Sequence, residues 1–188
     1  MTRRALDLLG GAICLLLAIV LLVVGLKANS LGDFAHDNVR QNLEEQKIFF
    51  PKESELQAAE RSTDVVKNAG KQVLTGSQAE AYANDFIAVH LSHIAGGKTY
   101  SEVSAAAQAD PTDTKLAGQA QTLFRGETLR GLLLEAYAFG KMGDEASAIA
   151  PWLLGGAVLL ALLGLGGLLH AFTHADRHRV GDTGTTAI

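Results

Sequence analysis

The sequence has one cysteine, three prolines and few charged residues. Because Cys14 has no second cysteine to pair with, no disulfide can form within the chain, and packing alone must stabilise any folded part. Charged residues make up 19% of the chain and hydrophobic residues 48%. This balance is more apolar than that of an ordinary soluble domain, so the composition favours a membrane protein.

The common catalytic motifs are also missing. The sequence contains no Gly-x-Ser-x-Gly, no Walker loop, no dinucleotide fingerprint and no Cys-x-x-Cys. Gly96-Gly97-Lys98-Thr99 has the ending of a Walker A loop but lacks its leading glycine and preceding strand, so we interpret it as a helix stop. These absences predict a protein that is not an enzyme and has no cofactor.

Long apolar runs lie near both ends of the chain. Residues 8–26 read LLGGAICLLLAIVLLVVGL, and residues 149–172 read IAPWLLGGAVLLALLGLGGLLHAF. At about 1.5 Å per residue, each run is long enough to cross a hydrocarbon layer of about 30 Å. Trp152 lies at the outer end of the second run, where an amphipathic ring favours the headgroup region. We therefore predict two transmembrane helices.

The first apolar run could also be a cleaved signal peptide, since Arg3 and Arg4 precede it. Its length exceeds the roughly 7–15 residues of a signal core, and the only small-residue site is Ala28-Asn29-Ser30. Both features favour a retained anchor.

Basic residues flank each apolar run on the side nearer the chain terminus. Arg3 and Arg4 precede the first run and Arg177 and Arg179 follow the second, which predicts cytoplasmic termini, although Lys27 argues mildly against this. Residues 28–148 hold 17 acidic and 11 basic residues, a balance that predicts no nucleic-acid partner. The expected order is a cytoplasmic N-terminus (1–7), a first transmembrane helix (8–26), an extracytoplasmic helical domain (27–148), a second transmembrane helix (149–172) and a partly disordered cytoplasmic tail (173–188).

Signals for helix starts and helix ends recur through the central segment. The predicted fold is therefore all-α, with two transmembrane helices flanking an extracytoplasmic bundle of four to six helices. The first span should continue as one helix to Phe50-Pro51, where proline ends it. A second helix is expected over 53–68. Ser77 with Glu80 and Thr99 with Glu102 have the spacing of capping boxes and predict two further helix starts.

The last central helix is expected to begin at Thr112 or Asp113 and to run to Gly140. Gly126 is expected to kink or interrupt this helix, and Gly143 is expected to separate it from the second span.

Two histidine groups are candidate metal sites. His90 and His93 are three residues apart on a predicted helix, but a metal would need a further ligand, and the sequence has no Glu-x-x-His pair. His170, His174 and His178 recur every four residues and could bind a metal or haem or respond to pH. The favoured interpretation is helix packing for the first group and anchoring among lipid headgroups for the second.

Candidate partner contacts fall in two places. The stretch LFRGETLRGLLLEAYAFG sets four charges beside a dense apolar run, and Glu127 and Arg130 are one turn apart and can pair. Small residues in the spans allow close helix packing, either with the other span of the same chain or with a larger complex. The candidate contacts are Arg125, Glu127, Arg130, Glu135, Gly155, Gly156, Gly164 and Gly167.

Three stretches together resemble a family of actinobacterial two-span membrane proteins: LTGSQAEAYANDFIAVHL from Leu74, AGGKTYSEVS from Ala95, and LFRGETLRGLLLEAYAFG from Leu123. The QKIFFP turn at 46–51 extends the resemblance, which implies a Gram-positive envelope. Some members carry the label aromatic ring-opening dioxygenase. The residues here argue against that activity. Such enzymes are soluble and use a metal site, whereas this sequence predicts a membrane-anchored helical domain without a convincing set of metal ligands.

The leading hypothesis is a non-enzymatic membrane protein whose outer helical domain binds a partner, as an accessory subunit of an envelope or respiratory complex. Its expected partners are the lipid bilayer and a membrane protein or a second copy of the chain. One alternative is a metal- or haem-dependent redox protein or enzyme that uses the histidines. Another is an extracytoplasmic sensor or ligand-binding module.

Overall fold

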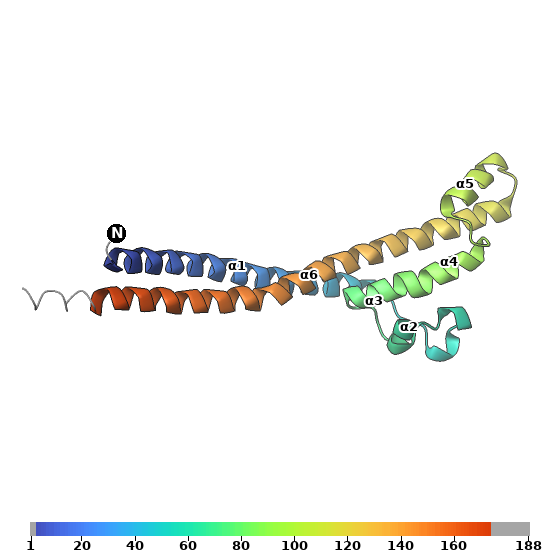
Figure 1. Ribbon diagram of the computed structural model, residues 1–188. Helices are drawn as coiled ribbons and strands as arrows, with labels where there is room; N and C mark the ends of the chain where they lie inside the picture. The colour runs from blue at the N-terminus through green and yellow to red at the C-terminus, as the bar shows by residue number, and fades with distance from the viewer. Residues whose placement is uncertain (1–2, 174–188) are drawn as a thin grey trace, which may run out of the picture. The chain divides into compact units, whose positions relative to one another are not determined.

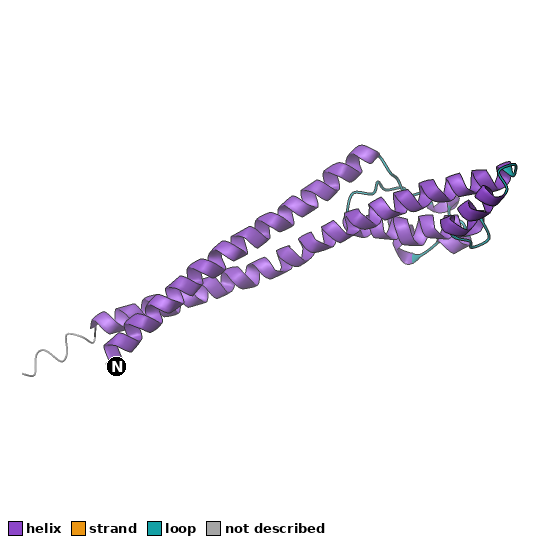
Figure 2. Cartoon of the chain, turned by 90° about the horizontal axis from the view of Figure 1, so that it is seen from above, coloured by secondary structure: helices purple, strands orange, loops and turns teal. Residues whose placement is uncertain are grey.

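The computed structural model describes residues 3–173 of the chain (Figure 1). Within this range every regular element is helical, and the only bridge between extended segments joins Phe49 to Gln72 (Figure 2). The chain forms two compact units: a terminal unit (Met1–Gly32 with Glu145–Ile188) and a central unit (Asp33–Asp144). The long helices α1 (Arg3–Gln46) and α6 (Thr114–Thr173) contribute residues to both units.

In the terminal unit, α1 and α6 pack against each other through small residues. The buried positions recur every seven residues, which keeps one seam facing the partner helix when two helices wind around each other with a left-handed twist. They are Gly11, Ala18, Gly25 and Gly32 on α1, and Ala150, Ala157, Gly164 and Ala171 on α6. The helices run antiparallel, since Gly11 lies near Gly164 whereas Gly25 lies near Leu154.

The two backbones approach closely at Gly11 and Gly164. A Cβ atom on Gly11 would lie 2.9 Å from the carbonyl oxygen of Gly164, and one on Gly164 would lie 2.9 Å from that of Gly11. Any larger residue at these positions would collide with backbone. Small residues here serve the contact between the two long helices of this chain.

The structure corrects two expectations about α6. The helix is continuous from Thr114 to Thr173, so Gly126 does not interrupt it and Gly143 does not separate it from the apolar segment. Gly143 is buried inside the helix, and a Cβ there would lie 2.8 Å from the Cβ of Ala35. The glycine permits a close helix contact and is not a stop. Pro151 also lies inside α6.

The predicted extension of the first apolar helix is confirmed. α1 ends at Gln46, and Lys47 then adopts a positive φ of 52°, which leaves the helical conformation. The helix therefore ends five residues before Pro51, and the expectation that it runs to Phe50-Pro51 and is ended by the proline is wrong.

The prediction of a single helix over 53–68 is wrong. The chain instead forms two short 3₁₀ turns, η1 (Glu53–Glu55) and η2 (Ala58–Glu60), and then α2 (Thr63–Asn68). The Glu55 carboxylate accepts a hydrogen bond from the Lys52 backbone N–H, and the Glu60 carboxylate accepts one from Gln57. These repeated caps stop each turn from growing into the next.

The next helical stretch consists of α3 (Gly76–Ala81), the π-helical segment η3 (Tyr82–Ile87) and α4 (Ala88–Ile94). Its start corrects the predicted Ser77–Glu80 capping box, because Thr75 is the N-cap. The Thr75 hydroxyl accepts from Gln78 N–H, and the Gln78 side chain accepts from the backbone of both Leu74 and Thr75. Ser77 lies within the first turn.

The buried positions of this stretch explain the π-helical segment. Ala79, Ala83, Ile87 and Leu91 are all buried and are spaced four residues apart. Positions four apart drift by about 40° per step around an α-helix of 3.6 residues per turn. A π turn is wider, because its hydrogen bonds join residues five apart, and it takes up part of this drift. The buried side chains therefore stay on one face.

The predicted capping box at Thr99 and Glu102 is confirmed, and it opens α5 (Tyr100–Ala109). The Glu102 carboxylate accepts hydrogen bonds of 2.8 Å from the Thr99 backbone N–H and of 2.8 Å from its hydroxyl. These bonds favour the charged carboxylate, so they lower the pKa of Glu102. After α5, Asp113 caps α6 by accepting from the backbone N–H groups of Lys115 and Leu116.

Thr99→Ala should raise the pKa of Glu102 toward its ordinary value of 4.5, because both hydroxyl-dependent bonds of the box are lost. In the wild type the stabilisation from Glu102 is complete above pH 4.5 and disappears as the pH falls through the lowered pKa. An NMR pH titration of the Glu102 side chain measures the shift. Ser101→Ala, next to the box, is the control, and an equal shift there would contradict the assignment.

The core of the central unit lies where α1, the segment from Phe50 to Val73, and the helical elements from α3 to α6 meet. Phe50 packs edge-on against Tyr82, with ring centroids 5.1 Å apart. Burial raises the pKa of the Tyr82 hydroxyl. The largest fully buried side chains of the unit are Leu43, Leu123, Leu133, Val65, Val73 and Val103.

Two glycines of α6 should respond in opposite ways to alanine. No atom of residues 3–173 lies within 4 Å of a Cβ on Gly131, so Gly131→Ala should stabilise the central unit by up to about 1 kcal/mol through helix propensity. A Cβ on Gly126 would collide with Cδ2 of Leu91, so Gly126→Ala forces Leu91 to move and should lose that gain or reverse it. Thermal unfolding of both variants provides the comparison. Equal stabilisation would contradict the packing described here.

Candidate partner-binding site

A surface groove runs between the helical stretch η3–α4 and the first half of α6, within the central unit. Its volume is about 340 Å³ and its lining is almost entirely apolar. We call it the α4–α6 groove. Its lining residues are Phe86, Ile87, His90, Leu91, Ile94, Thr122, Arg125, Gly126 and Leu129.

Three contacts hold the two sides of the groove together. The absence of a side chain at Gly126 lets Leu91 pack directly on α6. The Gln119 side-chain amide donates a 2.8 Å hydrogen bond to the carbonyl oxygen of Ile94. Further along, Arg130 donates a 3.3 Å hydrogen bond to the side chain of Asn84. Along these three contacts the residue numbers fall on the η3–α4 side and rise on the α6 side, so the two sides run antiparallel.

Two nitrogen-bearing side chains, those of His90 and Arg125, border the groove. His90 stacks on Phe86, and its Nδ1 lies 3.7 Å from a carboxylate oxygen of the buried Glu60. Arg125 is exposed, and its side chain has no hydrogen bond or ion pair with any residue in the part of the chain that the structure describes. A free guanidinium beside an apolar channel can receive a carboxylate as apolar surface is covered.

Backbone geometry marks the same place. Phe86 and Ile87 belong to the π-helical segment η3. Single π turns inside helices are uncommon and are frequent at functional sites. Here the turn sets Phe86 and Ile87 at one end of the groove.

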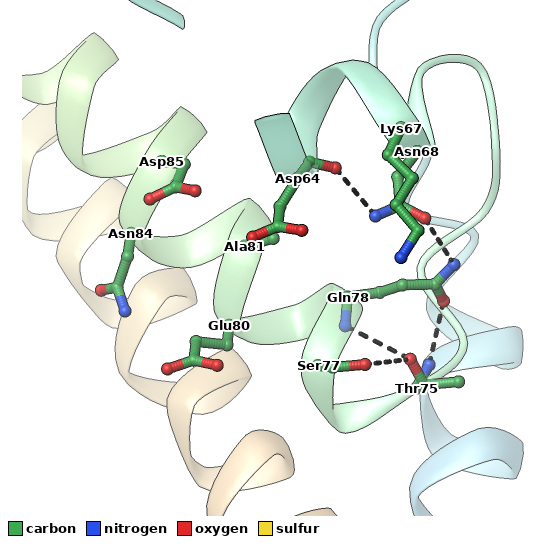
Figure 3. Close-up of a pocket in the computed structure, with 10 residues that line it drawn as sticks. All are labelled: Asp64, Lys67, Asn68, Thr75, Ser77, Gln78, Glu80, Ala81, Asn84 and Asp85. Atoms are coloured by element: carbon green, nitrogen blue, oxygen red, sulfur yellow. Dashed lines mark hydrogen bonds between the residues drawn. The ribbon is translucent and has the colours of Figure 1, made fainter. Parts of the chain in front are cut away.

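A second hollow of about 470 Å³ is polar and lies between α2, α3 and η3. Figure 3 shows Asp64, Glu80 and Asp85, one from each element, around its opening. Asp85 accepts a 2.8 Å hydrogen bond from the Ser62 hydroxyl. Across residues 3–173 no three histidine, cysteine, aspartate or glutamate side chains lie close enough together to hold a metal ion.

The candidate histidines are placed as follows. His93 is exposed near the end of α4, and His90 contacts Glu60 as described, so no third ligand joins them among the described residues. In the terminal unit, His170 Nδ1 lies 3.0 Å from a carboxylate oxygen of Asp7. His174 and His178 lie outside the described residues.

The four candidate charged contacts do not lie in one site. The predicted pair of Glu127 and Arg130 is present at 3.3 Å. Arg125 borders the α4–α6 groove, whereas Glu135 lines a different hollow of about 410 Å³ between α1 and α6 in the central unit. Sequence reasoning therefore found the charged member of the groove but grouped it with residues that lie elsewhere.

The candidate glycines differ in their surroundings. Cβ atoms on Gly156, Gly164 and Gly167 would each meet atoms of α1 within 4 Å. A Cβ on Gly155 would meet nothing within 4 Å in the described part of the chain. Three of the four therefore contact the other long helix of this chain, and contact with a separate partner stays a prediction.

Several groove residues were missed from the sequence, among them Leu91, Ile94 and Thr122. Their spacing on two separate helices is ordinary, and only the fold brings them together. Gly126 offered a signal, since a glycine inside a run of good helix formers needs a packing reason.

Comparisons with known proteins add no assignment: no protein-family model matches the sequence, and no curated protein or solved structure is significantly similar to it. The resemblance to an actinobacterial membrane family therefore stays a prediction.

Proposed function

We propose that this chain is a non-enzymatic integral membrane protein that crosses the bilayer twice and binds a partner protein through its central unit. The observation that carries the proposal is the α4–α6 groove, with its apolar lining and with an Arg125 side chain that is unpaired among residues 3–173. In this role the protein serves as an accessory subunit of a larger envelope complex.

Exposed apolar surface supports the membrane part of the proposal. Both α1 and α6 are long and apolar enough to cross a membrane, and only 17% and 11% of their most apolar windows are buried within the chain. Leu16, Leu162 and Leu169 are 64, 64 and 65% exposed. Monomeric soluble proteins rarely expose contiguous apolar surface of this kind, and lipid would cover it.

The distribution of basic residues supports an orientation. Arg3 and Arg4 precede the first apolar run, and Arg177 and Arg179 follow the second, so cytoplasmic termini satisfy the positive-inside rule at both. The central unit would then lie on the extracytoplasmic side.

Cysteine labelling tests this topology. With Cys14 changed to serine, one new cysteine is placed at Thr112 or at Thr2, and intact cells are treated with a membrane-impermeant maleimide. Labelling should occur at position 112 and should require lysis at position 2. The opposite result would invert the orientation, and equal labelling at both positions would contradict two crossings.

Site-specific crosslinking tests partner binding. A photoreactive residue at Thr122, on the edge of the groove, should form an adduct with one protein in native membranes, and purified chain and purified adduct partner should then rebind. The same residue at Gln108, exposed on α5, is the control. No protein adduct from Thr122 together with a partner-free monomer in mild detergent would contradict the proposal.

Elemental analysis and a visible absorption spectrum of the same purified protein separate this function from a redox role. A stoichiometric metal or a haem band would favour the histidine-based alternative.

A further inference from the structure

We propose, building on the function above, that the α4–α6 groove receives one short amphipathic helix of the partner, with an apolar ridge and a carboxylate placed to meet Arg125. The partner thereby becomes a defined chemical class: a helix whose buried face is apolar and whose acidic residue lies at the edge of that face.

The spacing of the groove residues fits a helix. Ile87, Leu91 and Ile94 line one side at intervals of four and three residues. Thr122, Gly126 and Leu129 line the other side at the same intervals. Two antiparallel helices whose side chains have the same spacing leave a channel between them, and a row of side chains from a third helix can pack into this channel.

The length of the groove sets the length of its occupant. Ile94 lies seven positions after Ile87, which corresponds to about 10 Å or two helical turns. Two turns present three or four apolar side chains on one face. The recognised element is therefore short, and its remaining length can contact other parts of the partner.

The charges around the groove indicate which polar residue the bound helix carries. The central unit holds 16 acidic and 11 basic residues between positions 33 and 144, so a broadly acidic partner would be repelled. At the groove, however, Glu127 is paired with Arg130 and Glu60 lies beside His90, whereas Arg125 has no partner among the described residues. One carboxylate beside an apolar ridge satisfies Arg125 without crowding the acidic groups around it.

The shape of the groove favours a helix over an acyl chain. Sites for small apolar ligands bury most of the ligand surface inside a cleft. The α4–α6 groove is an open channel on the surface of two helices, with the exposed Arg125 at its edge. A helix needs to bury only one face, which such a channel provides.

Peptide binding to the full chain in zwitterionic nanodiscs tests the inference. The probe is a fluorescent 15-residue helical peptide with leucines at i, i+3, i+4 and i+7 and glutamates beside them. A second peptide carries lysines in place of the glutamates. Anisotropy is corrected for binding to empty nanodiscs. The glutamate peptide should bind, and the lysine peptide should bind about tenfold more weakly.

Charge reversal at the groove provides the decisive comparison. Arg125→Glu should weaken the glutamate peptide about tenfold and restore binding of the lysine peptide. Lys115→Glu changes the net charge equally on an exposed part of α6 outside the groove lining and should leave both affinities unchanged. Equal binding of both peptides to the wild type, or equal effects of the two variants, would overturn the inference.

Its failure can be separated from failure of the proposed function. If the peptides show no dependence on Arg125 while Thr122 still crosslinks to a protein, partner binding stands and the helix assignment falls. If Thr122 crosslinks only to lipid, both fall, and the groove is a lipid site.

Discussion

Leu133→Ala is expected to lower the free energy of unfolding of the central unit by about 2–5 kcal/mol, because removal of a fully buried leucine loses transfer energy and leaves a cavity. Leu133 is 1% exposed and belongs to the same core as Leu43 and Leu123. Amide hydrogen exchange of the full chain in detergent, followed over residues 33–144, measures the loss.

The neighbouring residue provides the control for this prediction. Leu132 is 55% exposed on the same turn of α6, so Leu132→Ala removes the same atoms from a position that is largely uncovered. Its effect should be much smaller, because little apolar area leaves the interior. Similar losses for the two variants would place the core on a different face of α6.

Gly164→Leu is expected to destabilise the pairing of α1 and α6 in the terminal unit by about 1–3 kcal/mol. The upper part of this range applies because the new Cβ would lie 2.9 Å from the carbonyl oxygen of Gly11 and 2.8 Å from Cγ of Leu15. A flexible side chain could move aside, but the backbone oxygen cannot do so without separating the helices. Thermal unfolding in detergent, followed by circular dichroism, measures the effect.

Gly166→Leu is the matched control, since Gly166 lies in the same segment and a Cβ there would meet nothing within 4 Å among the described residues. It gains the same helix propensity without the collision. Gly166→Leu should therefore leave the melting temperature unchanged or raise it. A loss as large as that of Gly164→Leu would show that the outer face of α6 is also packed.

Local signals in the sequence predicted the long apolar helices and the start of α5. The length of the apolar runs was enough to predict the long helices, and two residues three positions apart, Thr99 and Glu102, were enough to predict the start of α5. Such features depend on neighbouring residues, so no tertiary information was required. The same logic failed at Ser77, because Thr75 with Gln78 offered an equally spaced box. The Gln78 side chain decided between them by accepting from two backbone groups at once.

Glycine misled the prediction in α6. Gly126 and Gly143 were interpreted as a break and a stop, yet both lie inside the helix and allow close contact with Leu91 and Ala35. A glycine that ends a helix and one that fits a crowded contact are indistinguishable until the neighbouring helix is known. The groove was hidden for the same reason, since Arg125 could be singled out from sequence, but its apolar surroundings belong partly to α4.

The π-helical segment η3 makes the groove depend on the number of residues as well as on their identity. A single π turn carries roughly one residue more than the α-helical turn it replaces. Deleting one residue between Ala83 and Phe86 would therefore convert the π turn into an α-helical turn, and Ala79 would stay on the same face as Leu91, about three full turns away. Inserting one residue there would instead rotate Ala79 and Ala83 by about 100° relative to Leu91, and the buried row and the groove wall could then no longer form together. An insertion in the six residues of η3 is consequently more damaging to the site than a deletion of the same length.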